Sequence, residues 1–393
     1  MVQIKSLKAE KIKDSRENAT LEVFIGADRE IANASVPSGA STGILEAKEI
    51  EISQAIENIE KVIAPNLIGK NPLNQIGIDN LLIDIDATPD KSKLGGNTMI
   101  GTSMAIVRLT AQIRKIPLYR YISELFGRPG VTIPRPCFNI INGGAHAQND
   151  LAIQEFMIVP KGNTFEENFE IGKHVYKKLG EILKEKFGKI EMGDEGGYAP
   201  PISSTKEAIE YILKADNEQK TEIILDCAAS QFYKPDRYLI EGKEMNRNQL
   251  NEYYKGLVDA YPIIGLEDPM AENDWQGFQM IFRELGDKII IIGDDLLVTN
   301  PARIQEAAEK TACNGVIIKL NQIGTVSEAI QAVKIAKQYK WKTIVSHRSG
   351  ETMDDFIADF AVGIGSDFIK SGAPGPAERM VKYNRLLEIS NEI

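Results

Sequence analysis

Short hydrophobic runs that each end in one polar residue recur along the second half of the chain. They are separated by about 20–40 residues, and most of the gaps hold apolar residues at helical spacing. Strands alternating with helices predict a parallel sheet, and in a β/α barrel the carboxyl ends of the strands meet on one face. We therefore expect three carboxylates, two lysines and a histidine in one pocket, suited to divalent metal, a general base and an anionic substrate. The six runs are EIILD ending at Asp226, PIIGLE at Glu267, IIIIGD at Asp294, GVIIK at Lys319, TIVSH at His347 and DFIK at Lys370.

The first third of the chain has a different order of elements. Three strands are predicted before residue 40, in VQIKSLKAEKI, ATLEVFIG and REIANASV. Isoleucines at helical spacing over residues 50–63 then predict a helix that Pro65 ends. Strands followed by helices indicate an α+β unit. Further helices are expected around residues 74–86, 98–115 and 118–126.

From about residue 130 the pattern changes to alternating units. GRPG at residues 127–130 marks the boundary, CFNII and QEFMIVP predict strands, and residues 165–187 predict an amphipathic helix. We expect an N-terminal α+β domain at residues 1–128 and a β/α barrel at residues 129–393. Later helices are expected at residues 301–311, 326–339 and 376–393.

Length and charge limit the number of domains and the classes of partner. The 393 residues suit a barrel of roughly 250 residues plus a further domain, and 43% hydrophobic with 26% charged residues is ordinary for a globular protein. A net charge of −10 argues against nucleic acid and membranes as partners. A local cluster of cations can still bind an anionic substrate.

The cysteines and the N-terminus indicate the compartment. Cys137, Cys227 and Cys313 are far apart and form no C-x-x-C pair, so neither a disulfide framework nor a zinc site is expected. The first residues contain no apolar secretory segment, and no run reaches the roughly 18 apolar residues of a membrane span. We therefore expect a cytoplasmic protein.

Asp226, Glu267 and Asp294 are the strongest candidate metal ligands. Three carboxylates at successive strand ends form the oxygen-rich site that Mg²⁺ prefers. A strand-end carboxylate can instead cap the next helix, but three in consecutive units favour the metal.

The lysines and the SHRSG segment suggest a base and an anion site. Burial after GVII is expected to lower the pKa of Lys319 and make it a candidate base; the alternative is a lysine paired with a metal-site carboxylate. Lys370 could have the same role or bind an anion. His347 lies beside Arg348, which suits bidentate recognition of phosphate or carboxylate, and Ser349 adds a hydroxyl. A surface salt bridge is the alternative for Arg348.

Three glycine-rich loops hold further polar groups. GDEGG carries Glu195, a candidate general acid or base, and NGGAHA carries His146. SGASTG at residues 38–43 has hydroxyls, including Ser41, but lacks the order of a P-loop. Each loop alone is more often just a turn. His174 is interpreted as a surface residue.

Together these motifs resemble the enolase family, the glycolytic hydro-lyases. The resemblance runs in the family's order from about residue 14 to 387. It implies an enolase-type (β/α)8 barrel that carries the active site, with an N-terminal α+β capping domain. It also implies Mg²⁺-dependent, reversible dehydration of 2-phospho-D-glycerate to phosphoenolpyruvate. The matching strings are VPSGASTG, KSKLGGN, NGGAH, QEFMIVP, GDEGGYAP, LDCAAS, LEDPMAENDW, DDLLVTNP, IIKLNQIGT, SHRSGET and IKSGAP.

The resemblance assigns the metals and the acid–base groups. The first Mg²⁺ would bind the three strand-end carboxylates, and Ser41 would help bind a second as its loop closes. Lys319 would remove the proton at C2, and Glu195 would assist departure of the C3 hydroxyl. Glu155, in QEF, would work with Glu195, and His146 would lie near the substrate.

The resemblance also assigns the substrate contacts. Arg348 and Ser349 would bind the phosphate, and Lys370 would face the substrate carboxylate. His347 and Gln154 would line the same pocket. No membrane or nucleic-acid partner is implied.

Several segments depart from the family pattern. DSRENAT at residues 14–20 lacks the usual Gly and Pro, the segment after SGASTG is shorter, and Pro376 replaces a usual arginine. The family implies a homodimer, and these changes leave a monomer or an altered interface as the alternative. Two other functions stay open: another enolase-superfamily enzyme that abstracts a proton, and a catalytically inactive structural or binding protein on the same fold.

Overall fold

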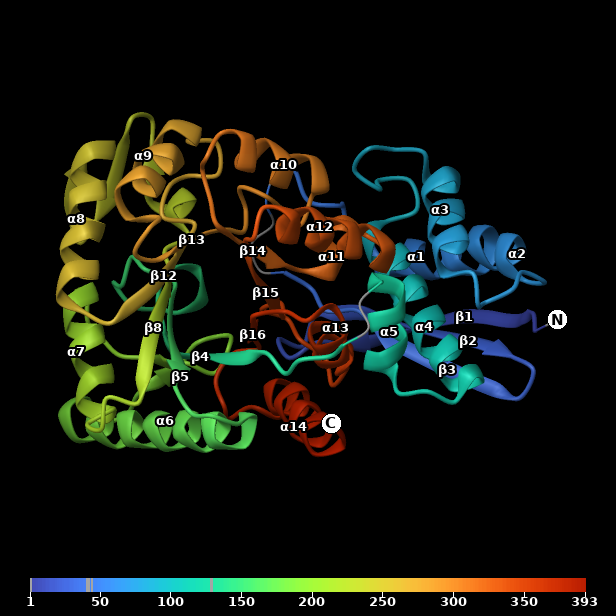
Figure 1. The fold of residues 1–393 in the computed structure, drawn as a ribbon, viewed down its shortest axis with the longest axis horizontal. Helices are drawn as coiled ribbons and strands as arrows, with labels where there is room; N and C mark the ends of the chain where they lie inside the picture. Colours follow the sequence, from blue (N-terminus) through green and yellow to red (C-terminus); the bar gives the residue numbers. More distant parts are fainter. Residues whose placement is uncertain (1, 40–42, 44, 128–129) are drawn as a thin grey trace.

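The chain folds into an N-terminal α+β part and a barrel, which lie side by side (Figure 1). The structure is a computed structural model that describes residues 2–39, 43, 45–127 and 130–393. In Figure 1 the N-terminal strands and helices, in blue, are on the right, and the barrel, from green to red, is on the left.

A three-stranded antiparallel sheet begins the N-terminal part, as its alternating apolar residues predict. It consists of β1 (Ile4–Lys13), β2 (Ala19–Ala27) and β3 (Glu30–Ser35), with β2 in the centre. One face packs on α4 (Gly96–Arg114), whose long buried stretch fills the core. The predicted helices around residues 74–86, 98–115 and 118–126 are confirmed as α3 (Gln75–Asp86), α4 and α5 (Leu118–Phe126).

The prediction that Pro65 ends the helix over residues 50–63 is wrong. The chain forms α1 (Ile52–Asn58), a π-helical turn at Ile59–Ile63 and then α2 (Ala64–Leu67). Pro65 lies in the first turn of α2, where a missing backbone N–H costs little. The wider π turn therefore lets the helical path continue through the proline.

Eight strands form the closed barrel within the described residues. The ring is closed because β16 pairs with β4, and seven of the eight strands run parallel. Inward-pointing residues such as Met157, Ile224 and Ile317 fill its interior as a separate apolar cluster. In ring order the strands are β4 (Arg135–Asn142), β5 (Glu155–Pro160), β8 (Thr221–Asp226), β12 (Ile263–Glu267), β13 (Ile290–Gly293), β14 (Gly315–Ile318), β15 (Lys342–Ser346) and β16 (Phe368–Lys370).

The expectation of an all-parallel sheet is wrong at β5. This strand runs antiparallel to both neighbours, β4 and β8. Residues 143–154 join β4 to β5 through a 3-10 turn, η2 (Gly144–His146), and contain no α-helix of the kind that usually crosses between parallel strands. The reversal places the first residue of β5, Glu155, opposite Asp226 at the rim where the other strands end.

Helices cover the outside of the barrel. The predicted helix over residues 165–187 is α6 (Phe165–Phe187), which lies along the lower edge in Figure 1. The predicted helices at 301–311, 326–339 and 376–393 are α10 (Pro301–Glu309), α12 (Val326–Gln338) and α14 (Ala377–Glu392). The other elements are α7 (Thr205–Ala215), α8 (Arg247–Ala260), α9 (Trp275–Leu285), α11 (Leu320–Ile323), α13 (Phe356–Ile364), η3 (Ala229–Phe232), a hairpin of β6 (Glu191–Met192) and β7 (Tyr198–Ala199), and a small sheet of β9 (Tyr233–Lys234), β10 (Arg237–Ile240) and β11 (Lys243–Met245).

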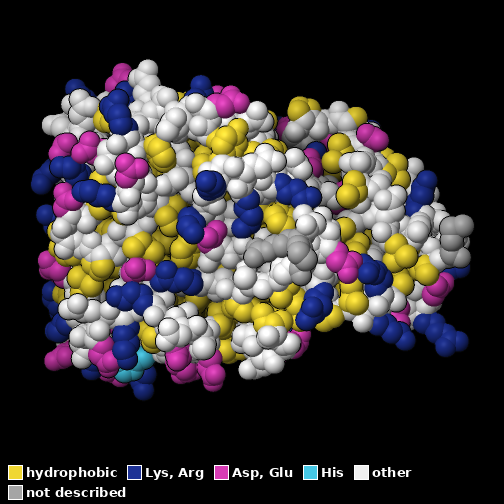
Figure 2. Space-filling view, in the orientation of Figure 1, with side chains coloured by type: hydrophobic (Ala, Val, Ile, Leu, Met, Phe, Trp, Pro, Cys, Tyr) yellow, Lys and Arg dark blue, Asp and Glu magenta, His cyan; other side chains and the backbone are white. Residues whose placement is uncertain are grey.

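Polar contacts join the N-terminal part to the barrel. Arg108 of α4 pairs with Asp354 and Asp355 before α13, and the backbone N–H of Tyr119 donates to Asp359. On the face shown in Figure 2, positive and negative side chains are interspersed among apolar ones. Among the described residues, none of the helices combines the length and apolarity that crossing a membrane requires. The three cysteines are buried and free.

Candidate active site

The six strand-end residues meet at one rim of the barrel, as the sequence predicts. Strand register sets Glu267 beside Asp226 and Lys370 beside Ser346. One pocket is lined by five of the six, and the sixth, Glu267, contacts Lys370 of that lining. The same pocket is lined by His146, Gln154, Glu155, Glu195, Arg348 and Ser349.

Lys370 lies at the centre of the carboxylates. Its Nζ is 2.7 and 2.8 Å from the two carboxylate oxygens of Glu267, 3.2 Å from Glu155 and 3.6 Å from Asp226. Burial alone would lower the pKa of this lysine, but the surrounding carboxylates raise it well above its ordinary value. The ammonium therefore compensates negative charge that the buried carboxylates could not hold alone.

Lys319 pairs with Asp294, and its expected low pKa is wrong in this state. Burial lowers the pKa of Lys319, as the sequence suggests, but the Asp294 charge has the opposite effect and leaves that pKa raised. The pKa of Asp294 is correspondingly lowered by Lys319 despite burial. The structure therefore contains the pairing of Lys319 with a carboxylate that the alternative predicts, and the role of Asp294 as a metal ligand stays a prediction.

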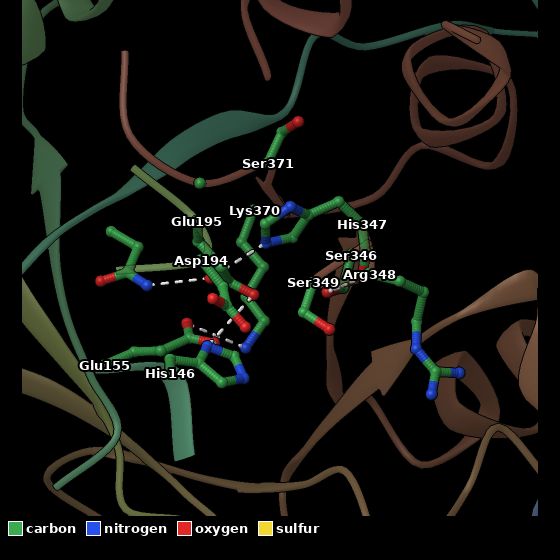
Figure 3. Close-up of polar contacts among 12 residues, drawn as sticks. His146, Glu155, Asp194, Glu195, Ser346, His347, Arg348, Ser349, Lys370 and Ser371 are labelled. Atoms are coloured by element: carbon green, nitrogen blue, oxygen red, sulfur yellow. Dashed lines mark hydrogen bonds and ion pairs between the residues drawn. The ribbon is translucent and has the colours of Figure 1, made fainter. Parts of the chain in front are cut away.

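Glu195 is held by a tight loop between β6 and β7. Gly196 has a φ of +81°, and a Cβ there would lie 2.5 Å from Pro376, so glycine is required to turn the chain back. The carboxylate Oε2 accepts a hydrogen bond of 2.9 Å from Asn139 and lies 3.3 Å from Nε2 of His347. In Figure 3 the His347 ring points toward Glu195.

His146 connects Glu195 with Glu155. Its Nδ1 is 3.4 Å from Oε1 of Glu195 and 3.9 Å from Oε1 of Glu155. Burial and the neighbouring Glu195 raise the pKa of Glu155 well above its usual value, whereas the histidines hold that of Glu195 well below its own despite burial. Glu155 therefore takes up a proton more readily than Glu195 in this state.

The His146–Glu155–Glu195 cluster has the spacing of a metal site, with ligand atoms within 4.8 Å of one another. Its members already have other partners: Glu155 pairs with Lys370, and Glu195 accepts from Asn139. A hard divalent cation prefers oxygen ligands, so the strand-end carboxylates suit it better than this cluster, which includes a histidine.

Arg348 is buried in an ion pair and does not form a surface salt bridge. Its Nη1 lies 2.9 Å from Oε2 of Glu46 and donates to Oδ1 of Asn321, also at 2.9 Å. In Figure 3 its guanidinium points away from Glu155 and His146. Arg348 therefore lies at the edge of the pocket, on the side of Glu46, a residue that follows the SGASTG segment in the chain.

Gln154 donates to Asp226 at 3.1 Å, so it orients one of the candidate ligands. Ser41 lies outside the described residues, and its role in a second metal site stays a prediction.

The sequence missed several groups at this rim. Asp268 accepts from the backbone N–H groups of Asp294 and Asp295, at 2.9 and 2.7 Å, and fixes the β13 end. Burial and Asp294 raise the pKa of Asp295 to about 7. Asp268 directly follows Glu267 in LEDP, and Asp295 directly follows Asp294 in GDD, so the sequence could have indicated both as rim residues. Asn139 and Arg379 had none, because they lie within a strand and a helix of ordinary pattern.

Family comparison agrees with this geometry over nearly the whole chain. A family model described as "Enolase, N-terminal domain" matches residues 4–122, and one described as "Enolase, C-terminal TIM barrel domain" matches residues 130–393. The chain belongs to the enolase family. As an enolase it is a lyase, a phosphopyruvate hydratase.

Similar proteins come from distant organisms. Enolase 2 of Hevea brasiliensis is 43% identical over 425 residues, covering 100% of this chain and 96% of the relative. Enolase B of Dictyostelium discoideum is 44% identical over 422 residues, covering 100% and 95%. The enolase of a Nitratiruptor species is 44% identical over 413 residues, covering 100% and 97%. These alignments exceed 393 residues, so the relatives carry insertions that this enolase lacks.

Proposed function

We propose that the rim pocket interconverts 2-phospho-D-glycerate and phosphoenolpyruvate, with Lys319 as base and Glu195 as acid, in glycolysis and gluconeogenesis. The relation between β14 and β5 carries the proposal. These strands are opposite in the eight-membered ring, four strands apart in either direction. Lys319 follows one, whereas Glu155, with Glu195 and His146 beside it, begins the other. A base and an acid on opposite sides suit removal of a proton from one carbon and hydroxide from the next.

Mg²⁺ is the proposed cofactor, at two ions per site, the first bound by the three strand-end carboxylates. Asp226, Glu267 and Asp294 are buried oxygen donors, and among the described residues the cations that contact them are Lys370 and Lys319. This donor set fits a hard divalent cation. When bound, the metal would stabilise the additional negative charge that develops on the substrate carboxylate. Ser41 is proposed for the second ion.

Proton removal falls to Lys319. The neutral amine takes the C2 proton, and the electron pair of that bond moves into the adjacent carboxylate to give an enediolate. Lys319 can be neutral only if the Asp294 charge is compensated elsewhere, because that charge is what raises its pKa. Burial then dominates and favours the uncharged amine.

Departure of hydroxide falls to Glu195, assisted by Glu155 and His146. A proton from Glu195 passes to the C3 hydroxyl, the C3–O bond breaks, and the electron pair of the enediolate forms the C2–C3 double bond as water leaves. His146 lies between the two carboxyl groups and can hold them in position relative to each other. Acid assistance is needed because hydroxide is a poor leaving group.

The substrate's anionic groups are assigned to the cations of the rim. Arg348 and Ser349 are proposed to bind the phosphate, and Lys370 to face the carboxylate. His347 and Gln154 line the pocket and hold Glu195 and Asp226 in place. Closure over residues 38–43 would exclude water.

The absorbance of the enol product tests the proposal. With 2-phosphoglycerate, an ultraviolet signal should rise only when Mg²⁺ is present. Lys319→Ala should abolish it, and Lys288→Ala, at an exposed lysine of the same barrel, should not. Turnover without metal, or by Lys319→Ala, would refute the assigned roles. No turnover in the wild-type enzyme would favour an inactive binding protein on this fold.

We further propose that the protein is a cytoplasmic homodimer. Each chain would consist of two domains, residues 1–128 and residues 129–393. Three buried free thiols support a reducing compartment. The departures in DSRENAT and after SGAP make a monomer the alternative, and light scattering distinguishes the two.

A further inference from the structure

Arg379 of α14 is completely buried beneath the active-site loops. All four N–H groups of its two terminal nitrogens have acceptors. Nη1 lies 2.6 Å from Nδ1 of His347 and donates to the carbonyl of Arg348 at 2.7 Å. Nη2 donates to the carbonyls of Asp194 and Ser349, at 2.9 and 2.6 Å. This arginine touches none of the reacting atoms assigned above, so its effect must pass through the groups it holds.

The contact with His347 fixes the histidine's tautomer. A guanidinium has five donors, no acceptor, and no accessible deprotonated form. Nδ1 of His347 must therefore accept, and in a neutral imidazole the proton is then on Nε2. Burial, followed by the positive charge of Arg379, favours the neutral ring: the pKa of His347 is lowered to about 4, although Glu195 and Glu351 oppose this.

The fixed tautomer directs a donor at one oxygen of Glu195. Nε2 of His347 faces Oε2, which already accepts from Asn139. Asn139 donates to Oε2, and a proton on Nε2 of His347 would lie close to the same oxygen, 3.3 Å from it, so a proton on Oε2 would clash with both. The other oxygen, Oε1, faces His146 and the pocket. A proton held by Glu195 therefore resides on Oε1.

We propose that Arg379 is a positioning residue that locks His347 as the Nε2–H tautomer, so that the acidic proton of Glu195 is held on Oε1, facing the substrate. The proposal rests on the role of Glu195 as acid. Asn139 supplies the second donor of the same arrangement.

Nitrogen chemical shifts of the free enzyme test the lock directly. The chain has three histidines, and His347→Gln and His174→Gln variants assign the signals of uniformly ¹⁵N-labelled protein. Between pH 5 and 8, Nδ1 of His347 should show the shift of an unprotonated nitrogen and Nε2 that of a protonated one. A protonated Nδ1, or averaged shifts, overturns the proposal. This measurement uses the wild-type chain and needs neither substrate nor turnover.

Two substitutions separate positioning from structural support. In Arg379→Met, the His347 nitrogens should move toward averaged tautomers and kcat should fall at least tenfold. Arg379→Lys, which keeps one charged donor, should restore part of both. A lower Tm with unchanged nitrogen shifts would mean that Arg379 only supports the fold, and would overturn the proposal. If Arg379→Met does not fold, the wild-type spectrum alone decides.

The two failures are distinguishable. Absence of dehydratase activity in the wild-type enzyme would refute the proposed function and leave the tautomer measurement intact. Full activity with a protonated Nδ1 would refute the lock and leave the proposed function intact.

Discussion

The guanidinium of Arg348 and the carboxylate of Glu46 form a buried ion pair that joins the N-terminal part to the barrel rim. Nη1 of Arg348 is 2.9 Å from Oε2 of Glu46, and both side chains are less than a tenth exposed. Oε1 of Glu46 accepts from the backbone of Gly43 and from Gln322. Arg348, which we assign to phosphate binding, is thus held by a residue that follows the SGASTG segment. Phosphate binding can therefore act on that segment through Glu46.

Removing the charge of Glu46 should destabilise the enzyme. Glu46→Gln keeps the shape of the side chain but removes the carboxylate charge that lies 2.9 Å from the buried guanidinium, so the free energy of unfolding should fall by about 2–4 kcal/mol. Urea unfolding of the substrate-free enzyme measures this. Glu57→Gln removes a half-exposed carboxylate and should change stability by less than about 1 kcal/mol. Equal effects of the two variants would mean that the Arg348–Glu46 pair contributes little.

His347 should make stability depend on pH between about 4 and 6.5. Its folded pKa, about 4, is below the ordinary 6.5, so the unfolded chain binds the extra proton first. The stabilisation is fully present above the pKa of the unfolded chain, 6.5, and is lost as the pH falls toward the pKa of the folded protein, about 4. The loss approaches roughly 3 kcal/mol.

A comparison of variants isolates this pH dependence. Unfolding free energies at pH 7 and pH 4.5 should differ less in His347→Gln than in the wild-type enzyme. His174→Gln, at an exposed position of α6, should retain the wild-type difference. An identical pH dependence in His347→Gln would show that this histidine is already charged or unshifted.

Mg²⁺ should stabilise the folded enzyme without any substrate. A ligand at a hundredfold excess over its dissociation constant adds about 2.7 kcal/mol, so Tm should rise by several degrees. Glu267→Gln removes one proposed ligand and should abolish most of the rise. Glu252→Gln, on the exposed side of α8, should keep it. A Tm that does not respond to Mg²⁺ in the wild-type enzyme would contradict a metal site at the strand ends.

The sequence predicted the strands and their rim residues because each signal is local. A run such as GVII followed by Lys319 predicts both a buried strand and a polar residue at the end of that strand. The direction of β5 carries no such signal: QEFMIVP reads as a strand in either direction, and its reversal is seen only in its antiparallel pairing with β4 and β8. That reversal is what places Glu155 among the carboxylates at the rim.

The state of the charged groups could not be predicted from local pattern. Lys319 follows an apolar run, so burial alone gives a low pKa, whereas the facing Asp294 gives a high one. Similarly, Arg379 reads as an ordinary helix residue, and only the packing of α14 under two loops brings it to His347. Such pairings depend on contacts between residues far apart in the chain.

Exchange of the C2 proton of 2-phosphoglycerate with deuterated solvent tests the central claim most directly, because it separates the base from the acid. Glu195→Gln should keep exchanging this proton while formation of phosphoenolpyruvate falls at least a hundredfold. Lys319→Ala should lose both, and Glu191→Gln, an exposed carboxylate four residues before Glu195, should lose neither. Exchange that persists in Lys319→Ala would contradict the account.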